Sequence, residues 1–338
     1  MATYRAFQVT GSRQFELVER EVPAPGPGRV GIRVLSCGVC HSDALAVEGM
    51  RADPSQPIVP GHEIVGVIEA LGDGVTGWEV GQRVGVGFLA GHCNECSSCR
   101  RGDFVNCVNQ QQTGTSLDGG YAEYTVARSN ALVHIPEELS SLDAAPLLCA
   151  GLTTFRALGQ SGARMGGTVA VQGIGGLGHL GLQYAAKLGY RVVAIARGDQ
   201  KADLAARLGA DHYIDSSAGD PGAALRELGG ADAVISTSAD GAAMSPLVAG
   251  LKPNGRMVVV GAGPTPISVS TADLIFGARS ISGSLTGTPI DNEDNLEFSA
   301  RKGIRPMIET VPLDQAPKAY ERMMAGAARF RVVLDTAA

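Results

Sequence analysis

The stretch TVAVQGIGGLGHLG, residues 168–181, contains the pattern that decides the fold of this chain. An apolar run typical of a buried strand is followed by Gly173, Gly175 and Gly178, spaced G-x-G-x-x-G, and then by an apolar-periodic helix. The first glycine permits a tight bend, the second lets the backbone approach a pyrophosphate, and the third lets the helix pack against the strand. A glycine-rich packing turn without a ligand is the alternative. The strand before and the helix after favour a dinucleotide site, to which we also assign Gly176, Leu177 and Lys201.

Outward from this turn, strands alternate with helices of roughly 8 to 13 residues from position 151 onward. RVVAIA and DAVIST are typical of strands, and DQKADLAARLG of a helix capped by Asp199 and ended by Gly209. A second helix is expected to begin with Asp220 as its cap and Pro221 at its first position. The alternation predicts an α/β fold with a doubly wound parallel sheet of the Rossmann type.

The first 150 residues carry short strand patterns instead, among them YRAFQV, RVGIRVLSCGV and IVGVIEALG, separated by Pro, Gly and Asp. A chain of 338 residues is too long for a single core. We therefore expect a β-rich domain over 1–150, a dinucleotide-binding domain over 151–286, and a return to the first domain over 287–338. This last segment is expected to be irregular until a helix, LDQAPKAYERMMAG, and a strand, FRVVLD, end the chain.

The end of the strand RVVAIA bears on the choice of dinucleotide. An NAD site usually has Asp or Glu there to hold the ribose 2′-hydroxyl, and in this chain the position is Ala196, followed by Arg197. With no carboxylate to repel it, a 2′-phosphate can pair with the guanidinium. Because we assign Asp199 to the helix cap, we favour NADP(H) over NAD(H). In the alternative, Arg197 is a solvated loop cation and NAD is used without discrimination.

Composition excludes several classes of partner. The net charge is −6 and no basic stripe is present, so a nucleic-acid partner is not expected. The N-terminus lacks the apolar core of a secretory signal, and no run of 18 apolar residues is present to span a membrane. We therefore expect a cytoplasmic protein whose thiols stay reduced.

Four cysteines with the spacing C-x2-C-x2-C-x7-C lie between residues 93 and 107. Two-residue gaps let neighbouring thiolates converge on one tetrahedral ion, and four thiolates leave no open position for a substrate. The pattern predicts a structural zinc site; an iron–sulfur cluster or unrelated thiols are the alternatives. His92 is expected to be a bystander. The predicted ligands are Cys93, Cys96, Cys99 and Cys107.

The remaining motifs carry a resemblance to a known family. Together with the four-cysteine lobe they are CGVCHSD, GHEIVGVI, DGGYAEY, CAGLTT and GIGGLGHLG, at residues 37–43, 61–68, 118–124, 149–154 and 173–181. Over nearly its whole length the chain resembles the zinc-dependent medium-chain alcohol dehydrogenases. The resemblance implies a GroES-like, partly open barrel that carries two zinc sites, joined to the Rossmann domain, with the substrate in the cleft between them.

The resemblance also implies residue roles. Two cysteines and one histidine are the catalytic-zinc ligands known from alcohol dehydrogenase, and they leave a fourth position for water or substrate. By resemblance these ligands are Cys40, His62 and Cys149, so two zinc ions are expected per chain. Asp43 would fix the His62 ring, Glu63 would lie behind the metal, and Ser42 would begin the proton relay. His41 would contact the cofactor phosphates and Thr153 the nicotinamide side, while Phe88 and Leu89 would line the substrate cleft.

One position departs from the family pattern. Many members have a histidine two positions after the aspartate of CGVCHSD, where this chain has Leu45. The relay beyond Ser42 would then run through the cofactor ribose and water or another group. Proton transfer is therefore the step of the reaction for which the motifs identify the fewest residues.

The resemblance predicts hydride transfer between a small alcohol or aldehyde and NADP(H) or NAD(H). Polyol dehydrogenases, an alternative within the family, often carry Glu where this chain has Cys149. A non-catalytic zinc-ribbon protein with a nucleotide-binding domain is the alternative from another class, and a zinc-free reductase is excluded by the seven cysteines. We expect a homo-oligomer and favour a tetramer over a dimer.

Overall fold

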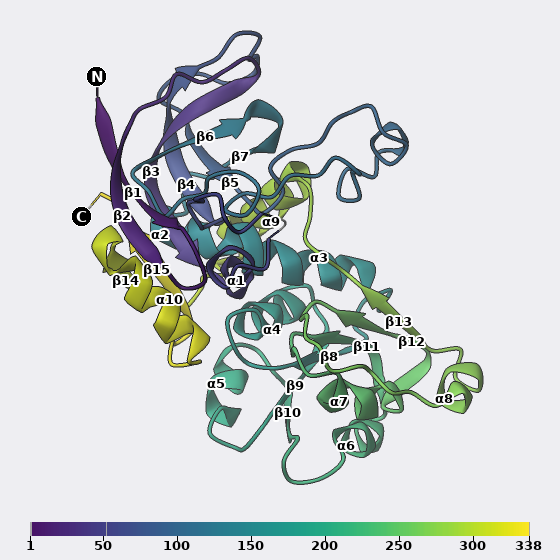
Figure 1. Cartoon of the computed structure of the whole chain (residues 1–338). Helices are drawn as coiled ribbons and strands as arrows, with labels where there is room; N and C mark the ends of the chain where they lie inside the picture. The colour runs from purple at the N-terminus through teal and green to yellow at the C-terminus, as the bar shows by residue number, and fades with distance from the viewer. Residues whose placement is uncertain (1, 52, 338) are drawn as a thin grey trace. The chain divides into compact units, whose positions relative to one another are not determined.

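The computed structural model describes residues 2–51 and 53–337 (Figure 1). The chain divides into two compact units. The first unit consists of Met1–Cys149 together with Thr286–Ala338, and the second of Ala150–Leu285. The borders expected at residues 150 and 286 each differ from these bounds by one residue.

The second unit contains a six-stranded parallel sheet in the order β10-β9-β8-β11-β12-β13. The chain starts at β8 (Thr168–Gln172), all of whose residues are buried, moves out to β9 and β10, and returns to β11 on the other side of β8. Ligands of doubly wound sheets bind at such a reversal, beyond the carboxyl ends of the strands. The predicted Rossmann-type sheet is thus confirmed. The other strands are β9 (Arg191–Ala196), β10 (His212–Asp215), β11 (Ala231–Ser236), β12 (Leu251–Val259) and β13 (Ser280–Gly283).

Helices connect these strands, and their first residues test the expected caps. Asp220 accepts the Gly222 N–H at 2.8 Å and Pro221 begins the helix, as predicted. The prediction for Asp199 was wrong: the helix begins at Ala202, and the Asp199 backbone carbonyl, not its carboxylate, accepts the Ala202 N–H at 2.9 Å. No helix within the two described ranges is both long and apolar enough to cross a bilayer. The helices of this unit are α3 (Leu152–Gln160), α4 (Gly178–Lys187), α5 (Ala202–Arg207), α6 (Pro221–Glu227), α7 (Gly241–Met244) and α8 (Thr271–Ile275).

The first unit is built around β3 (Arg29–Val39), which pairs antiparallel with β15, β4 and β6. Its seven-stranded sheet has the order β14-β15-β3-β4-β5-β7, with β6 attached to β3. The apolar core includes Ile32, Ile64 and Ile68, all nearly inaccessible to solvent. The β-rich fold expected for this part of the chain is confirmed. The other strands are β1 (Thr3–Val9), β2 (Phe15–Glu21), β4 (Ile64–Leu71), β5 (Arg83–Val86), β6 (Tyr124–Arg128), β7 (Leu132–His134), β14 (Ile308–Pro312) and β15 (Arg331–Asp335).

The segment after residue 287 is not irregular, which corrects the prediction. It forms α9 (Pro289–Lys302), a helix of 14 residues with Thr288 and Asp291 as a capping box and Gly303 in the left-handed conformation at its end. Part of its buried face consists of polar residues, so the apolar period that predicts a helix is broken. The terminal helix α10 (Ala316–Met324) and β15 agree with the prediction. The remaining helices of this unit are α1 (Ala44–Val47) and α2 (Ser141–Pro146).

Candidate metal centres and dinucleotide site

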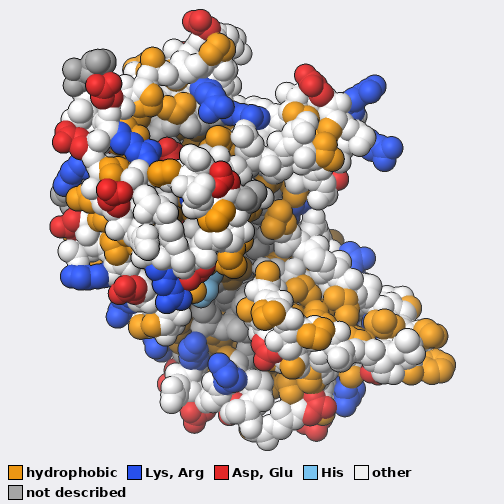
Figure 2. All heavy atoms as spheres, viewed as in Figure 1, with side chains coloured by type: hydrophobic (Ala, Val, Ile, Leu, Met, Phe, Trp, Pro, Cys, Tyr) orange, Lys and Arg blue, Asp and Glu red, His pale blue; other side chains and the backbone are white. Residues whose placement is uncertain are grey.

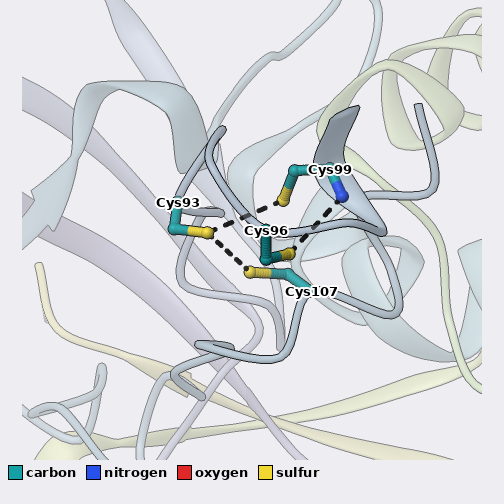
Figure 3. Close-up of side chains that lie close together, drawn as sticks. All are labelled: Cys93, Cys96, Cys99 and Cys107. Atoms are coloured by element: carbon teal, nitrogen blue, oxygen red, sulfur yellow. Dashed lines mark hydrogen bonds between the residues drawn. The ribbon is translucent and has the colours of Figure 1, made fainter. Parts of the chain in front are cut away.

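The four cysteines of the lobe converge, as Figure 3 shows. Their sulfur atoms all lie within 4.8 Å of one another, with 3.9 Å between Cys93 and Cys99 and 3.6 Å between Cys93 and Cys107. A tetrahedral ion with zinc–sulfur bonds of about 2.3 Å places its sulfurs about 3.8 Å apart. The set, completed by Cys96, therefore fits zinc. His92 lies outside this group, and its ring packs against Phe104 with 4.2 Å between centroids.

Local surroundings shift the pKa values of the lobe thiols in opposite directions. The backbone N–H groups of Glu95 and Cys96 face the Cys93 sulfur and lower its pKa to about 6. Burial instead raises the pKa of Cys99 to about 12. Because metal ligands must be deprotonated, the ion has to displace the remaining thiol protons when it binds.

A second donor set lies in the first unit, with Cys40 and His62 buried and Cys149 half-buried. It brings together Cys40 at the end of β3, His62 just before β4, and Cys149 in a π-helical turn, Leu147–Gly151. The sulfurs of Cys40 and Cys149 are 3.8 Å apart, the separation that a tetrahedral zinc requires. His62 is 1% exposed, and its Nε2 has no hydrogen-bond partner among the described residues. A buried nitrogen of this kind calls for a partner, and a metal ion supplies one.

Asp43 connects two of these donors. Its Oδ1 lies 2.8 Å from His62 Nδ1, and its Oδ2 accepts the Cys40 N–H at 2.9 Å. The Tyr121 hydroxyl donates to the same Oδ2 at 2.9 Å. The motif DGGYAEY contains Tyr121, but sequence reasoning assigned this residue no role. A carboxylate held by several partners keeps the His62 ring in one orientation, with Nε2 directed away from Asp43.

Glu63 lies next to the donor set, paired with an arginine from the far end of the chain. Arg331 of β15 donates to Glu63 Oε1 at 2.5 Å and to the Val39 carbonyl at 3.0 Å. Burial raises the pKa of Glu63 to about 8, against the opposing effect of Arg331. One Glu63 oxygen lies within 4.8 Å of the Cys40, His62 and Cys149 donors. Nothing in the sequence pattern pointed to Arg331.

The residues after Cys40 form a short turn, His41–Asp43, that leads into α1. His41 is exposed and Ser42 is half-buried. Leu45 packs against the apolar cluster of Phe88, Leu89 and Val105. Leu45 therefore has a packing role at the position where many family members have the relay histidine. The Phe88 ring in turn meets the His62 ring edge-on, with 5.1 Å between centroids.

The glycine turn lies between β8 and α4 in the second unit. Gly173 has φ +89°, a conformation that side chains other than glycine's rarely adopt. A Cβ on Gly178 would overlap the Gly173 carbonyl, whereas a Cβ on Gly175 would meet only open space. Gly173 thus allows the tight turn, Gly178 allows the helix to pack closely, and Gly175 leaves space for a ligand to approach the backbone. Lys201 donates to the Ile174 carbonyl at 2.8 Å inside the turn. Gly176 and Leu177 belong to this turn, and Thr153 is buried in α3 of the same unit.

The carboxyl end of β9 contains a group that sequence reasoning missed. Ala196 lies opposite Asp215 of β10, and Arg197 is exposed. Asp215 accepts the Gly198 N–H at 2.7 Å and two bonds from Ser217, and these bonds lower its pKa. A carboxylate therefore lies near Arg197, contributed by the neighbouring strand and already engaged by backbone and hydroxyl donors.

Comparison with known proteins identifies the family. Residues 26–137 match the model of the alcohol dehydrogenase GroES-like domain, and residues 176–301 that of the zinc-binding dehydrogenases. The chain is 44% identical to alcohol dehydrogenase notN of Aspergillus sp. (strain MF297-2), over 92% of this chain and 91% of that protein. It is 40% identical to an alcohol dehydrogenase of Geobacillus stearothermophilus, over 95% and 96% of the two chains.

Solved structures agree. A cinnamyl alcohol dehydrogenase from Sorghum bicolor superposes with a TM-score of 0.89 and 32% identity, over 99% of this chain and 98% of that one. The structure of a protein named CAD from Helicobacter pylori, complexed with NADP(H), has a TM-score of 0.88 and 30% identity over the same shares. With both domain models, these relatives and the donor sets in agreement, the chain belongs to the zinc-dependent medium-chain dehydrogenase/reductase family.

Proposed function

We propose that this chain is a zinc-dependent alcohol dehydrogenase and aldehyde reductase that uses a nicotinamide dinucleotide. The observation that carries the proposal is the converging set of Cys40, His62 and Cys149, with a buried His62 Nε2 that has no hydrogen-bond partner among the described residues and a sulfur separation of 3.8 Å. Three protein ligands leave a position for a substrate oxygen, which the four-cysteine lobe does not. The lobe is therefore proposed as a structural zinc site, giving two ions per chain.

Zinc at the three-ligand set would act as a Lewis acid, and the nicotinamide would accept or donate hydride. The chain's own residues provide orientation and proton transfer. Asp43 keeps His62 Nε2 available as a ligand, and Arg331 holds Glu63 in place beside the site by donating a hydrogen bond to it. We assign Ser42, half-buried and two residues from Cys40, to the first proton transfer. Because Leu45 carries no proton, the next acceptor would be the cofactor ribose or water.

For the cofactor we propose NADP(H) in preference to NAD(H). Arg197 is exposed directly after the strand end, where it is available to a 2′-phosphate, and Ala196 offers no carboxylate to a 2′-hydroxyl. The Helicobacter relative is named as a complex with NADP(H). Asp215 is a nearby carboxylate and would by itself favour the 2′-hydroxyl of NAD(H). Its Oδ1, however, already accepts three hydrogen bonds from Gly198 and Ser217. His41, Lys201 and Thr153 complete the proposed contacts.

For the substrate we propose a small primary alcohol and its aldehyde, with aromatic allylic alcohols included. Phe88 presents an aromatic face next to His62, and aromatic rings pack favourably edge to face. Two of the similar proteins are named as cinnamyl alcohol dehydrogenases, from Sorghum bicolor and Picea abies. Cys149, where polyol dehydrogenases often have Glu, supports simple alcohols over polyols.

We further propose a cytoplasmic homo-oligomer, with a tetramer favoured. Seven cysteines without a disulfide among the described residues suit a reducing compartment. The edge strand β13 of the second unit pairs with β12 alone among the described strands. An edge strand of this kind is a ready site for pairing with a second copy.

An alcohol and aldehyde panel, run in parallel with NAD(H) and NADP(H), tests the function. We expect about two zinc ions per chain and turnover of several primary alcohols. Cys40→Ser should leave a folded protein that binds cofactor but barely turns over, whereas Cys96→Ser should impair folding or assembly. Full activity with one zinc ion or fewer would refute the metal assignments. No turnover of any alcohol by the zinc-loaded protein would refute the function.

A further inference from the structure

Cys149 lies in an unusual backbone segment. Helix α2 ends at Pro146, and the chain continues as the π-helical turn Leu147–Gly151. Proline has no N–H and so interrupts the α-helical ladder. A π-helical turn is wide and rare, and it is frequently found at functional sites. The direction of the Cys149 side chain, whose sulfur is 3.8 Å from that of Cys40, therefore depends on the geometry of this turn.

Two asparagines of α9 hold the carbonyls of this turn. Asn292 Nδ2 donates to the Leu148 carbonyl at 3.0 Å, and Asn295 Nδ2 donates to the Leu147 carbonyl at 3.0 Å. Asn295 Nδ2 also lies 3.3 Å from Asn292 Oδ1, so the two amides are linked. The two side chains are 2% and 0% exposed. Burying an amide is unfavourable unless its hydrogen bonds are made, so these contacts account for two polar residues on the inner face of the helix.

The end of a neighbouring strand leaves room for this contact. A Cβ built on Gly87 would lie 3.2 Å from the Leu148 carbonyl oxygen and 3.4 Å from Asn292 Nδ2. Gly87 directly follows β5 and precedes Phe88, whose ring meets His62. The amide–carbonyl pair is thus enclosed between this strand end and α9.

We propose that Asn292 and Asn295 are positioning residues for the metal site: they hold the π-helical turn and thereby aim Cys149 at the ion. The proposal rests on the zinc site proposed above. Without the two amides, the Leu147 and Leu148 carbonyls would lose buried donors. The turn would then be free to relax toward ordinary i→i+4 bonding, which rotates the side chains beyond Pro146 about the helix axis and moves the Cys149 sulfur.

The test uses Asn292→Leu, Asn295→Leu and the double variant, since leucine has the same number and branching of side-chain heavy atoms as asparagine but no amide. Glu293→Gln is the matched control, because it changes a residue that lies between them in α9 and keeps the oxygen that accepts the His134 backbone N–H. The rate at which a chelator removes each of the two zinc ions is measured. The absorption bands of the protein loaded with Co²⁺ instead of zinc report thiolate coordination independently of activity.

In the double variant, one ion should leave ~10–100-fold faster, the range for partners that orient metal ligands, while the other leaves at the wild-type rate. The cobalt–thiolate bands should weaken, and kcat should fall with the cofactor KM unchanged. Wild-type rates and bands in the double variant would overturn the positioning role. Wild-type protein that holds metal only in the lobe would instead refute the proposed zinc site itself.

Three variants, the two single leucine variants and Gly87→Ala, keep the proposal testable if the double variant does not fold. Each single leucine variant removes one of the two carbonyl bonds and should give an intermediate rate. Gly87→Ala leaves both amides in place but puts a methyl group against the contact between Asn292 and the Leu148 carbonyl, so it should speed release of the same ion. Release from Gly87→Ala and from both single variants at the wild-type rate would contradict the proposal.

Discussion

Asp43 has more partners than its place in the motif CGVCHSD indicates. Its two oxygens face His62 Nδ1, the Cys40 N–H and the Tyr121 hydroxyl. Asp43 is 1% exposed and Tyr121 is fully buried, so neither has water as an alternative partner. Removing the hydroxyl leaves one lone pair of a buried carboxylate without its donor, which weakens the constraint on His62.

We expect Tyr121→Phe to lower metal affinity and kcat/KM by ~10-fold, the lower end for such partners, because Asp43 keeps its bond from the Cys40 N–H. Chelator competition and steady-state kinetics on the same preparation measure both quantities. Tyr4→Phe is the control, since its ring packs at a tilt against that of Tyr124, with 5.7 Å between centroids, and takes no part in the contacts of Asp43. Affinity within twofold of wild type would show that the Tyr121 hydroxyl has no part in orienting His62.

Arg197 is the residue on which the cofactor preference depends. Loss of an arginine–phosphate pair costs roughly 1.5 to 3 kcal/mol, the range for hydrogen bonds to charged groups. This corresponds to about 10- to 150-fold in affinity. Arg197→Ala should therefore weaken NADPH binding by that factor and leave NADH binding nearly unchanged.

Dissociation constants for both dinucleotides, measured by protein fluorescence, check this expectation. Arg207→Ala removes an exposed cation of α5 and controls for the change in net charge. Wild-type protein that binds NADH more tightly than NADPH would refute the preference without any variant. An equal loss of affinity for both cofactors in Arg197→Ala would show that Arg197 does not bind the 2′-phosphate.

At the scale of elements, one carboxylate joins three strands of the parallel sheet. Asp232 of β11 accepts the Thr168 N–H at the start of β8 at 2.8 Å and the Lys252 ammonium of β12 at 2.6 Å. Burial raises the pKa of Asp232, but the bonds from Lys252 and Thr168 outweigh it and lower the pKa overall. The ionised carboxylate therefore stabilises the register of these strands.

We expect Asp232→Asn to lower the free energy of unfolding at pH 7 by roughly 1.5 to 3 kcal/mol. A lowered folded-state pKa means that this stability is fully present above the unfolded pKa of about 3.9 and is lost as pH falls through the folded value. The difference between wild type and variant should therefore shrink below about pH 4.

Urea unfolding of the zinc-loaded protein between neutral and acid pH measures this difference. Asp294→Asn, which changes an exposed carboxylate on α9, is the control. A difference that stays constant across the pH range would mean that Asp232 contributes through packing alone.

At the scale of the whole molecule, the second unit presents an apolar surface at one edge of its sheet. β13 pairs with β12 alone among the described strands, and α8 lies next to it in the chain. Three apolar residues here are strongly exposed: Ile275 at 72%, Phe276 at 89% and Leu285 at 57%. Figure 2 shows hydrophobic side chains gathered over the part of the surface that carries α8. An edge strand with an apolar rim favours pairing with a second copy about a two-fold axis.

We expect Phe276→Asp to reduce the size of the assembly, because it places a charge in an interface that a second copy would bury. Light scattering after gel filtration, at several protein concentrations, measures the mass. Met165→Asp is the control, since Met165 is 97% exposed in the loop before β8. A wild-type monomer would refute the proposed oligomer, and an unchanged mass in Phe276→Asp would place the interface elsewhere.

The sequence by itself determined the features whose residues lie close together in the chain. The glycine turn follows from spacing within six residues, 173–178, and the lobe from four cysteines within fifteen, 93–107. In such stretches the backbone between the residues is short, so residue type and spacing restrict the geometry directly. Most strands of both units followed from local patterns for the same reason, although β5, β7 and β14 were not predicted, and the family followed from the motifs.

Only the tertiary structure decided which distant residues meet. Arg331 reaches Glu63 across 268 residues, Tyr121 reaches Asp43 across 78, and Asn295 reaches the Leu147 carbonyl across 148. No local pattern encodes these pairs, because each depends on the order and register of strands or on how a helix packs. Helix α9 was missed because its inner face carries the asparagines that the π-helical turn requires, and those polar residues break the apolar period. A helix whose buried face binds a backbone segment can be recognised only once that segment is in place.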